Sequence, residues 1–277
     1  MWSLPEVNTF GISNEDPVYR DFLIYYEEAK FALKLFEHKF KALNNDVNIL
    51  EIGSGIGLLS NQLASLGFKN ITCVEPNAKG FGNMLRLAEI VDAHPYYKQN
   101  KINKFDDLIE NFDTSQKFDF IFSFNVMEHI IEPSVVLNHI YKFLTINGEL
   151  YFICPNYFFP YEGHFNIPIV INKRITGLIF NRRINLLDAN DPLGLWESLN
   201  WINPRIIKKS LPPNSEIKFL GVASNLYFSR FDSDPLFKQR KGILVKVLAT
   251  ALRPIIKLLP TQVKPVIECS IRQNRTN

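Results

Sequence analysis

A short apolar segment that leads directly into three closely spaced glycines constrains the fold of this chain more than any other feature. Residues 47–52 read Val-Asn-Ile-Leu-Glu-Ile, residues 53–57 read Gly-Ser-Gly-Ile-Gly, and a helical pattern then extends to near Gly67. Residues 71–75 form the next apolar segment, and a second helical pattern extends through about Asp92. A strand, a glycine loop, a helix and a second strand form a βαβ unit, whose two strands are parallel. The sequence therefore predicts an α/β fold.

The rest of the chain continues this alternation of strands and helices. An amphipathic helix is predicted before the glycine loop, at residues 22–43. After the βαβ unit, strands are predicted at Tyr96–Gln99, Phe118–Ser123 and Glu149–Cys154, with a helix at Ser134–Leu144 and a turn at Asn147-Gly148. Two β-rich runs, Glu216–Leu220 and Leu226–Phe231, predict an antiparallel hairpin. The expected architecture is a doubly wound, Rossmann-like sheet of seven mostly parallel strands that ends in this hairpin, with an aromatic lid inserted at residues 155–210.

The spacing of the glycines distinguishes between classes of nucleotide-binding loop. A dinucleotide fingerprint requires a third glycine at the position of Leu58, but here it falls one residue early, at Gly57. A phosphate-binding loop of the NTPase type is excluded, because no Gly-Lys-Ser/Thr follows. Glu51 would repel a pyrophosphate and attract a ligand with ammonium and sulfonium groups, so the loop favours S-adenosylmethionine. Glu75, at the end of the second predicted strand, can accept hydrogen bonds from ribose hydroxyls.

Three segments carry motifs in a fixed order: residues 51–57, residues 74–77 (Val-Glu-Pro-Asn) and residues 118–130 (Phe-Asp-Phe-Ile-Phe-Ser-Phe-Asn-Val-Met-Glu-His-Ile). Together they resemble the class I S-adenosylmethionine-dependent methyltransferases, and the resemblance spans about residues 47–154. It implies S-adenosyl-L-methionine as the cofactor, bound by the glycine loop, the acid after strand two and residues at the end of strand four. The cofactor-binding residues that it implies are Glu51, Gly53, Ser54, Gly55, Gly57, Glu75, Pro76, Asn77, Ser123, Asn125 and Val126.

One position departs from the family pattern. Many members carry an Asp after strand three that contacts the adenine amino group, whereas this chain has Asn-Lys-Ile-Asn at residues 100–103. The candidates for the adenine contact are therefore the backbone of Lys101 and Ile102 and the side-chain amide of Asn103.

Methyl transfer from a sulfonium requires alignment of the acceptor with the methyl group and, for a hydroxyl acceptor, a base. His129, after strand four, and His164, in the insertion, are the candidate catalytic residues. The alternatives are that His129 only caps or packs a helix and that His164 only fixes its loop through a hydrogen bond. The candidate substrate-binding residues are Tyr161, Glu162 and Trp196, with a solvated or structural Glu162 as the alternative. No metal site is predicted, because His129, His139 and His164 lack His-x-x-x-His spacing.

The insertion is unusually aromatic, and its aromatic residues have two interpretations. The residues are Tyr157, Phe158, Phe159, Tyr161, Phe165, Phe180, Trp196 and Trp201. They either line a pocket for a ring or a lipid chain or close the small core of the lid itself.

The formal charge of +3 is the sum of two unlike parts. Residues 1–235 hold 22 Lys and Arg against 27 Asp and Glu, whereas residues 236–277 hold 9 against 1. Residues 243–259 are apolar except for Lys246, Thr250, Arg253 and Lys257, which fall on one narrow stripe of a helix. This pattern favours a helix lying in a membrane interface, and packing against the body or a second subunit is the alternative. Peripheral membrane contact is thus expected through residues 240–260, and no nucleic acid is expected as a partner.

Three parts are predicted: an N-terminal helical cap (1–46), an S-adenosylmethionine-binding methyltransferase domain (47–235, with the insertion 155–210) and a basic amphipathic tail (236–277). Three well-separated cysteines and the lack of a visible secretory signal indicate a cytoplasmic protein, and the tail adds the expectation of peripheral contact with the inner face of the membrane. We expect transfer of a methyl group to a small-molecule, lipid-precursor or glycan acceptor, at oxygen. The alternatives are a cofactor-binding scaffold without turnover and an NAD-dependent oxidoreductase.

Overall fold

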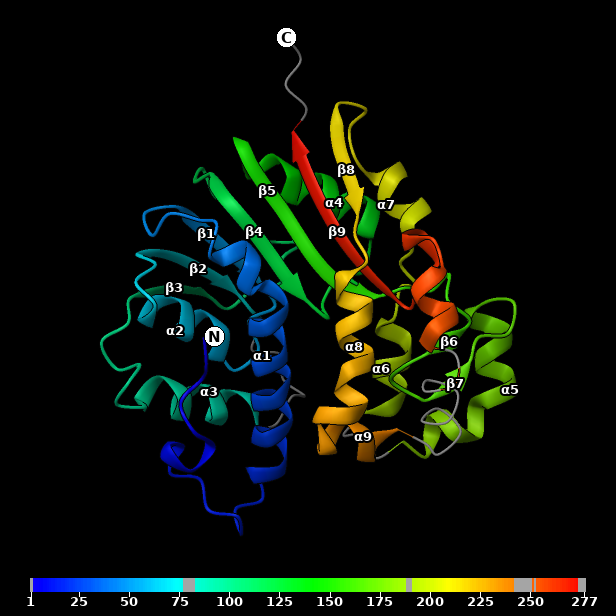
Figure 1. Ribbon diagram of the computed structural model, residues 1–277, viewed down its shortest axis with the longest axis horizontal. Helices are drawn as coiled ribbons and strands as arrows, with labels where there is room; N and C mark the ends of the chain where they lie inside the picture. The colour runs from blue at the N-terminus through cyan, green and yellow to red at the C-terminus, as the bar shows by residue number, and fades with distance from the viewer. Residues whose placement is uncertain (1, 77–82, 188–190, 242–250, 252, 274–277) are drawn as a thin grey trace. The chain divides into compact units, whose positions relative to one another are not determined.

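The computed structural model describes residues 2–76, 83–187, 191–241, 251 and 253–273. The chain divides into two compact units, residues 1–123 with 143–148 and residues 124–142 with 149–277. A seven-stranded sheet has the strand order β3-β2-β1-β4-β5-β9-β8 (Figure 1). Strand β1 pairs in parallel with β2 and β4, and β2 pairs in parallel with β3. Strand β9 is antiparallel to both of its neighbours, β5 and β8. The predicted seven-stranded, mostly parallel α/β sheet with an antiparallel C-terminal strand pair is confirmed.

The first unit contains the predicted βαβ unit. Its strands are β1 (Asn48–Ile52), β2 (Asn70–Val74), β3 (Ile102–Phe105) and β4 (Phe118–Phe124). Its helices are η1 (Val7–Phe10), α1 (Tyr19–Phe40), α2 (Leu58–Ser65) and α3 (Met84–Ala93). Strand β1 is buried along almost its whole length, as is usual for an inner parallel strand. On one face, Phe36 and Phe40 of α1 lie with ring centroids 5.3 and 5.1 Å from that of Phe122.

The second unit contains helix α4 (Pro133–Lys142) and the strands around β9 (Val266–Gln273). Strand β9 pairs with β5 (Leu144–Pro155) on one side and with β8 (Ser215–Phe219) on the other. Helices α8 (Val222–Ser233) and α9 (Pro235–Arg240) follow β8. Strand β9 lies inside the range 236–277 that the sequence assigns to a tail, so this part of the range belongs to the sheet.

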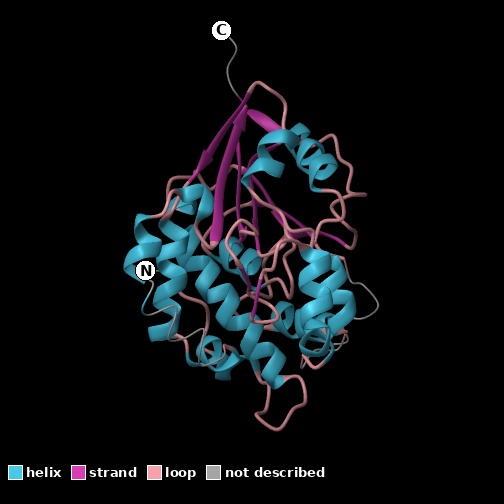
Figure 2. Ribbon diagram, turned by 90° about the vertical axis from the view of Figure 1, so that its right-hand side faces the viewer, coloured by secondary structure: helices cyan, strands magenta, loops and turns pink. Residues whose placement is uncertain are grey.

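The insertion between β5 and β8 adds a short hairpin and three helices, drawn like the other helices of the chain in cyan in Figure 2. It consists of the short hairpin β6 (Tyr161–Glu162) and β7 (Ile167–Pro168), followed by α5 (Lys173–Asn185), α6 (Pro192–Ser198) and α7 (Pro204–Ser210). The side chains of Asn172, Asp191 and Asn203 cap the three helices by accepting hydrogen bonds from backbone N–H groups of the first turn.

Several aromatic rings of the insertion pack on one another. Tyr157 stacks on Trp201 with centroids 5.4 Å apart, and Trp196 makes edge contacts with Trp201 at 6.2 Å and with Phe165 at 5.4 Å. Of the two interpretations of these aromatic residues, the contacts of these four rings favour closure of the insertion's own core.

The predicted strand at residues 96–99 is wrong. These residues form turns after α3, in which the N–H of Tyr97 donates to the carbonyl oxygen of His94. Tyr97 is buried, and its hydroxyl donates to Oε1 of Gln62 at 2.9 Å. An aromatic side chain anchors this turn, which is a role that β propensity does not distinguish from a strand.

The strand predicted at Leu226–Phe231 is also wrong, because these residues belong to helix α8. Arg230 and Asp234, four residues apart and both buried, form an ion pair at 2.7 Å that fits helical spacing. The antiparallel partner of β8 is β9 instead.

The predicted turn at Asn147-Gly148 lies inside β5, which runs without a break. A Cβ at Gly148 would lie only 2.7 Å from the carbonyl oxygen of Phe118. The glycine therefore permits a close approach of two backbones rather than a reversal of the chain.

Much of the predicted cationic stripe lies outside the described residues, since residues 242–250 and 252 are not described. Residues 253–258 are helical, and Arg253 forms an ion pair with Asp232 of α8 at 3.0 Å. Within the described part of the chain, no helix combines the length and the apolar character needed to cross a membrane.

Candidate active site

The glycine loop leaves the carboxyl end of β1 in a conformation that favours glycine at three positions. Gly53, Gly55 and Gly57 have φ angles of +73°, +54° and +78°. Other residues rarely adopt this left-handed region, so the loop explains why glycine occurs at these positions. A Cβ at Gly55 would meet nothing closer than the Tyr25 ring, at 3.9 Å. Glycine is therefore required at position 55 for its left-handed backbone conformation and not because a side chain would clash.

Glu75, which follows β2, is connected directly to this loop. Its Oε2 accepts a hydrogen bond from the backbone N–H of Gly55 at 2.8 Å. Partial burial raises the pKa of Glu75, and the Gly55 hydrogen bond opposes this effect. The acid and the glycine loop, which the sequence singled out separately, are thus joined by a hydrogen bond into one site.

Glu51 lies on β1, and its side chain is 5% exposed. The hydroxyl of Ser60 donates to its Oε2, and the same hydroxyl lies 2.8 Å from Sγ of Cys73. Burial raises the pKa of Glu51 to about 8, so the carboxyl group is mostly protonated at neutral pH. A nearby cation would favour its ionised form.

The end of β4 carries the next group of predicted residues. Ser123 pairs in register with Ile52 of β1, and its buried hydroxyl has no hydrogen-bond partner among the described residues. Asn125 follows the strand with a φ of +54°, and its Oδ1 accepts a hydrogen bond from the Tyr227 hydroxyl at 3.0 Å. The carbonyl oxygen of Val126 accepts from the backbone N–H of His129, which starts a tight turn.

The third strand lies further along the chain than the sequence predicted, so the candidates for an adenine contact do not follow it. Ile102 and Asn103 lie within β3, paired with Ile71 and Thr72, rather than after it. The residues that follow β3 are Asp106 and Asp107. Oδ1 of Asp107 accepts hydrogen bonds from Leu108 N and Asn111 Nδ2. Sequence reasoning considered residues 100–103 instead, because it placed the strand too early.

Ser54 lies in the loop, and Pro76 follows Glu75 as the sequence implies. Asn77 lies outside the described residues.

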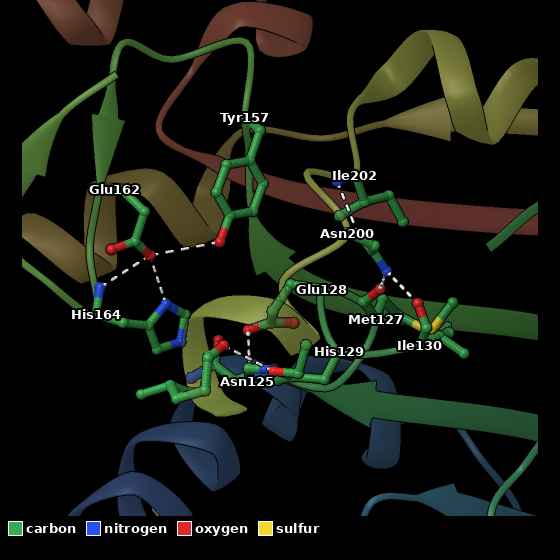
Figure 3. A network of polar contacts seen from close by, with 12 residues as sticks. Asn125, Met127, Glu128, His129, Ile130, Tyr157, Glu162, His164, Asn200 and Ile202 are labelled. Atoms are coloured by element: carbon green, nitrogen blue, oxygen red, sulfur yellow. Dashed lines mark hydrogen bonds and ion pairs between the residues drawn. The ribbon is translucent and has the colours of Figure 1, made fainter. Parts of the chain in front are cut away.

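In the second unit, Glu162 and His164 form a tight pair at the hairpin β6–β7 (Figure 3). Nδ1 of His164 lies 2.6 Å from Oε1 of Glu162. The same carboxylate accepts hydrogen bonds from His164 N at 3.0 Å, Phe165 N at 2.7 Å and the Tyr157 hydroxyl at 3.4 Å. Because Glu162 is fully buried and its oxygens are occupied, the solvated alternative for this residue is wrong.

The electrostatics of the pair follow from this geometry. Burial disfavours the charged form of His164, but the hydrogen bond and charge of Glu162 outweigh this effect and raise its pKa. Burial likewise disfavours ionised Glu162, yet His164 and the two backbone N–H groups hold its pKa below the usual value. His164 thus makes the predicted loop-fixing hydrogen bond through Nδ1, while this bond leaves Nε2 available.

His129 and Glu128 lie in the turn after β4 and approach His164. The rings of His129 and His164 are edge to face, with centroids 5.4 Å apart. Nδ1 of His129 lies 2.9 Å from the hydroxyl oxygen of Ser198. Burial and the neighbouring His164 lower the pKa of His129 to about 3, so its ring is neutral. Glu128 is fully buried, and burial raises its pKa to about 7.

Asn200 holds this turn in place and was not identified from the sequence. Its Nδ2 donates to the carbonyl oxygens of Met127 at 2.7 Å and Ile130 at 2.8 Å, and its backbone N–H donates to the carbonyl oxygen of Glu128 at 2.8 Å (Figure 3). Oδ1 of Asn200 accepts from the N–H of Ile202 at 2.8 Å. Nothing in the local sequence marks Asn200, because its partners lie about 70 residues away.

The other predicted substrate residues, Tyr161 and Trp196, make their contacts within the insertion. The Tyr161 hydroxyl donates to Oδ1 of Asn166 at 2.8 Å, and Trp196 packs among rings as described above, with Nζ of Lys173 5.9 Å from its ring centroid. A pocket of about 640 Å³ opens beside His129, and its lining includes Pro133, Lys173 and Asn200.

Comparison with known proteins gives a consistent result along most of the chain. A family model described as a methyltransferase domain matches residues 24–201. An uncharacterized protein of Mycobacterium tuberculosis is 33% identical over 256 residues, which cover 87% of this chain and 84% of that protein. The ubiquinone biosynthesis O-methyltransferase of Rickettsia conorii is 29% identical over 117 residues, which cover 40% of this chain and 37% of that enzyme.

Among solved structures, a Haemonchus contortus phosphoethanolamine N-methyltransferase 2 shares the fold, with a TM-score of 0.53 and 13% identity. The match covers 98% of this chain and 61% of that chain, whose structure contains phosphomonomethylethanolamine and S-adenosylhomocysteine.

Proposed function

The chain belongs to the methyltransferase-domain family, and we propose that this class I S-adenosylmethionine-dependent methyltransferase methylates a hydroxyl oxygen of a small-molecule or lipid-precursor acceptor. Membership in this family leaves no role for the nicotinamide cofactor considered as an alternative. The observation that carries the oxygen target is the Glu162–His164 pair, which holds an imidazole with Nδ1 engaged and Nε2 available as a base.

The first unit fits the cofactor. S-adenosylmethionine, when bound, supplies a methyl group on a positively charged sulfur. The left-handed glycines give the loop a path along which backbone can approach the ligand closely, and Glu75 offers a carboxylate at the end of β2 for the ribose hydroxyls. Ionised Glu51 would stabilise positive charge near the start of the loop.

We assign the adenine contact to Asp106 rather than to residues 101–103. Asp106 is the first residue after β3, which is where the family pattern places the acid that contacts the adenine amino group. Titration with S-adenosylhomocysteine should show weaker binding by Asp106→Asn and unchanged binding by Asp113→Asn, an exposed acid of the same region. If the parent, Asp106→Asn and Asp113→Asn all bind with equal affinity, Asn103 becomes the candidate for the adenine contact instead.

The chain's own groups perform the proton transfer in this proposal. Glu162 holds Nδ1–H of His164, so Nε2 can take the proton of the acceptor hydroxyl, and the carboxylate then stabilises the imidazolium. An amine acceptor that is already neutral needs no such base. The O-methyltransferase from Rickettsia, although similar over only part of the chain, supports the same choice of atom.

The test is formation of S-adenosylhomocysteine with matched pairs of phenol, alcohol and amine acceptors. We expect turnover with hydroxyl compounds, and a fall of about 100-fold or more in kcat for His164→Ala, as for loss of a general base. His139→Ala on α4 is the matched control. Preferred turnover of amines, or full activity of His164→Ala, would contradict methylation at oxygen. Cofactor binding without turnover of any acceptor would favour the alternative of a scaffold.

Peripheral membrane contact through residues 240–260 is a separate proposal. Ile255 and Leu258 are 57% and 87% exposed, and exposed apolar side chains beside cationic ones suit a membrane interface. Removal of residues 240–277 would delete β9, so point substitutions are the proper test. Ile255→Ser with Leu258→Ser should reduce pelleting with anionic liposomes, and unchanged pelleting would count against the proposal.

A further inference from the structure

Three potential metal ligands meet in the second unit although they are far apart in the sequence. One carboxylate oxygen of Glu128 and one ring nitrogen each of His129 and His164 all lie within 4.8 Å of one another. Glu128 and His129 come from the turn after β4, and His164 comes from the hairpin β6–β7 (Figure 3). The absence of His-x-x-x-His spacing excluded a site on one helix, but it does not bear on ligands that come from separate segments.

The hydrogen bonds assign the free nitrogen of each ring. Nδ1 of His164 faces the Glu162 carboxylate, which can only accept when ionised, so Nδ1 carries the proton. The single hydroxyl proton of Ser198 goes to the carbonyl oxygen of Leu195 at 2.9 Å, so Nδ1 of His129 must be the donor to Ser198. In the neutral rings Nε2 is therefore a lone-pair atom on both histidines, and Nε2 of His129 lies 4.0 Å from Oε1 of Glu128.

The surroundings of Glu128 independently indicate a binding site for a cation. Its side chain is fully buried, and neither carboxylate oxygen has a hydrogen-bond partner in the described part of the chain. A buried carboxylate without hydrogen bonds is costly, and such groups are normally paired or coordinate a metal.

We propose that Nε2 of His129, Nε2 of His164 and a carboxylate oxygen of Glu128 bind one divalent transition-metal ion of the zinc class. Two imidazole nitrogens and one carboxylate are a common ligand set for such ions and leave a position open for water or substrate. Each histidine also donates its other ring N–H, to Glu162 or Ser198, which is the arrangement that fixes metal-binding histidines in proteins.

The potential ligand atoms of Glu128, His129 and His164, one on each residue, need only a modest closure to bind an ion. Zinc ligands at about 2.0–2.1 Å in a tetrahedron are roughly 3.3 Å apart, so the atoms must approach by at most about 1.5 Å. A second role rests on the proposed function and replaces His164 as the base while the ion is bound, because the lone pair of its Nε2 is then occupied. An acceptor hydroxyl at the open position would lose its proton to solvent water at lower pH.

The experiment uses the full chain, stripped with a chelator and then titrated with Zn²⁺, with bound metal counted by elemental mass spectrometry and Co²⁺ absorption as the report on coordination. We expect one ion per chain and a loss of affinity of at least about 100-fold in His129→Ala and in His164→Ala. His139→Ala, which removes a histidine outside the cluster, should bind as the parent does. Glu162→Gln should weaken binding by about 10–100-fold, as for loss of an outer partner.

Glu128→Gln separates the proposal from a failure to fold. It removes a buried carboxyl group that accepts no hydrogen bond from the described residues, so it should abolish stoichiometric binding while leaving the metal-free protein at least as stable in thermal unfolding. A folded parent that binds no Zn²⁺ or Co²⁺, or an equal loss of affinity in His139→Ala, would overturn the metal site. Methyl transfer by metal-free enzyme at the full rate would leave the proposed function intact and overturn only the second role of the ion.

Discussion

Nδ1 of His164 lies 2.6 Å from Oε1 of Glu162, and the backbone N–H of the same histidine donates to the same oxygen at 3.0 Å. One carboxylate therefore fixes both the loop and the ring of His164. This double contact determines which ring nitrogen is available to a ligand.

Replacement of Glu162 by glutamine should separate positioning from cofactor binding. The amide can still accept one hydrogen bond, but it no longer stabilises an imidazolium, so we expect kcat to fall about 10-fold or more. Affinity for S-adenosylhomocysteine, measured by calorimetry, should not change. Glu197→Gln, an exposed acid on α6, should leave both values as they are. A parent-like kcat in Glu162→Gln would show that the carboxylate does not act through His164.

Replacement of Gly55 by alanine tests the left-handed loop. A Cβ at φ +54° costs about 1–2 kcal/mol or displaces the loop, and it disturbs the N–H that donates to Glu75. We expect weaker binding of S-adenosylhomocysteine by about 10-fold or more. Gly11→Ala is the matched control, because Gly11 has φ +70° and open space around it. Both variants should lose stability, and an equal loss of cofactor affinity in both would refute a specific role of the loop.

Burial of Glu51 predicts a pH dependence of stability. Its pKa is about 8 in the folded chain against 4.5 for the ordinary group, so the folded state holds the extra proton between these values. The contribution to stability is complete below about pH 4.5 and is lost as the pH rises through about 8, at up to about 1.4 kcal/mol per pH unit.

Urea unfolding of the cofactor-free chain at about pH 5.5 and about pH 8 measures this effect. Glu51→Gln should lose that part of the pH dependence, whereas Glu89→Gln, an exposed acid on α3, should retain it. Identical pH slopes for the parent and Glu51→Gln would show that the carboxyl group is not desolvated as the structure requires.

Asn200→Ala should affect both stability and turnover. It removes the side-chain hydrogen bonds to Met127, Ile130 and Ile202 and leaves two carbonyl oxygens and one N–H to find other partners. We expect a loss of about 2–4 kcal/mol in the free energy of unfolding and a lower kcat, because the turn that carries His129 is released. Asn185→Ala, which removes a hydrogen bond within the exposed part of α5, should cost much less. Chemical denaturation compares the free energies of unfolding of the two variants, and steady-state assays compare their kcat values.

The sequence by itself determined the βαβ unit and its glycine loop. An apolar strand, left-handed glycines and an acid at the next strand end are encoded by residues within a few positions of one another, so local backbone preferences suffice to predict them. The same reasoning failed for Tyr97, for helix α8 and for Gly148, whose conformations depend on Gln62, Asp234 and Phe118 respectively. Of these partners, Asp234 alone lies within a few residues of the group it fixes.

Only the tertiary structure decided which polar side chains meet in the second unit. His129 and His164 are 35 residues apart, and Asn200 reaches back about 70 residues to the turn that carries Glu128. No periodicity links such positions, because the contacts arise from the need to satisfy buried polar groups once the sheet and the insertion have packed. The sequence therefore predicted the individual histidines, whereas the fold alone brought them together with Glu128, Glu162 and Ser198 in one cluster.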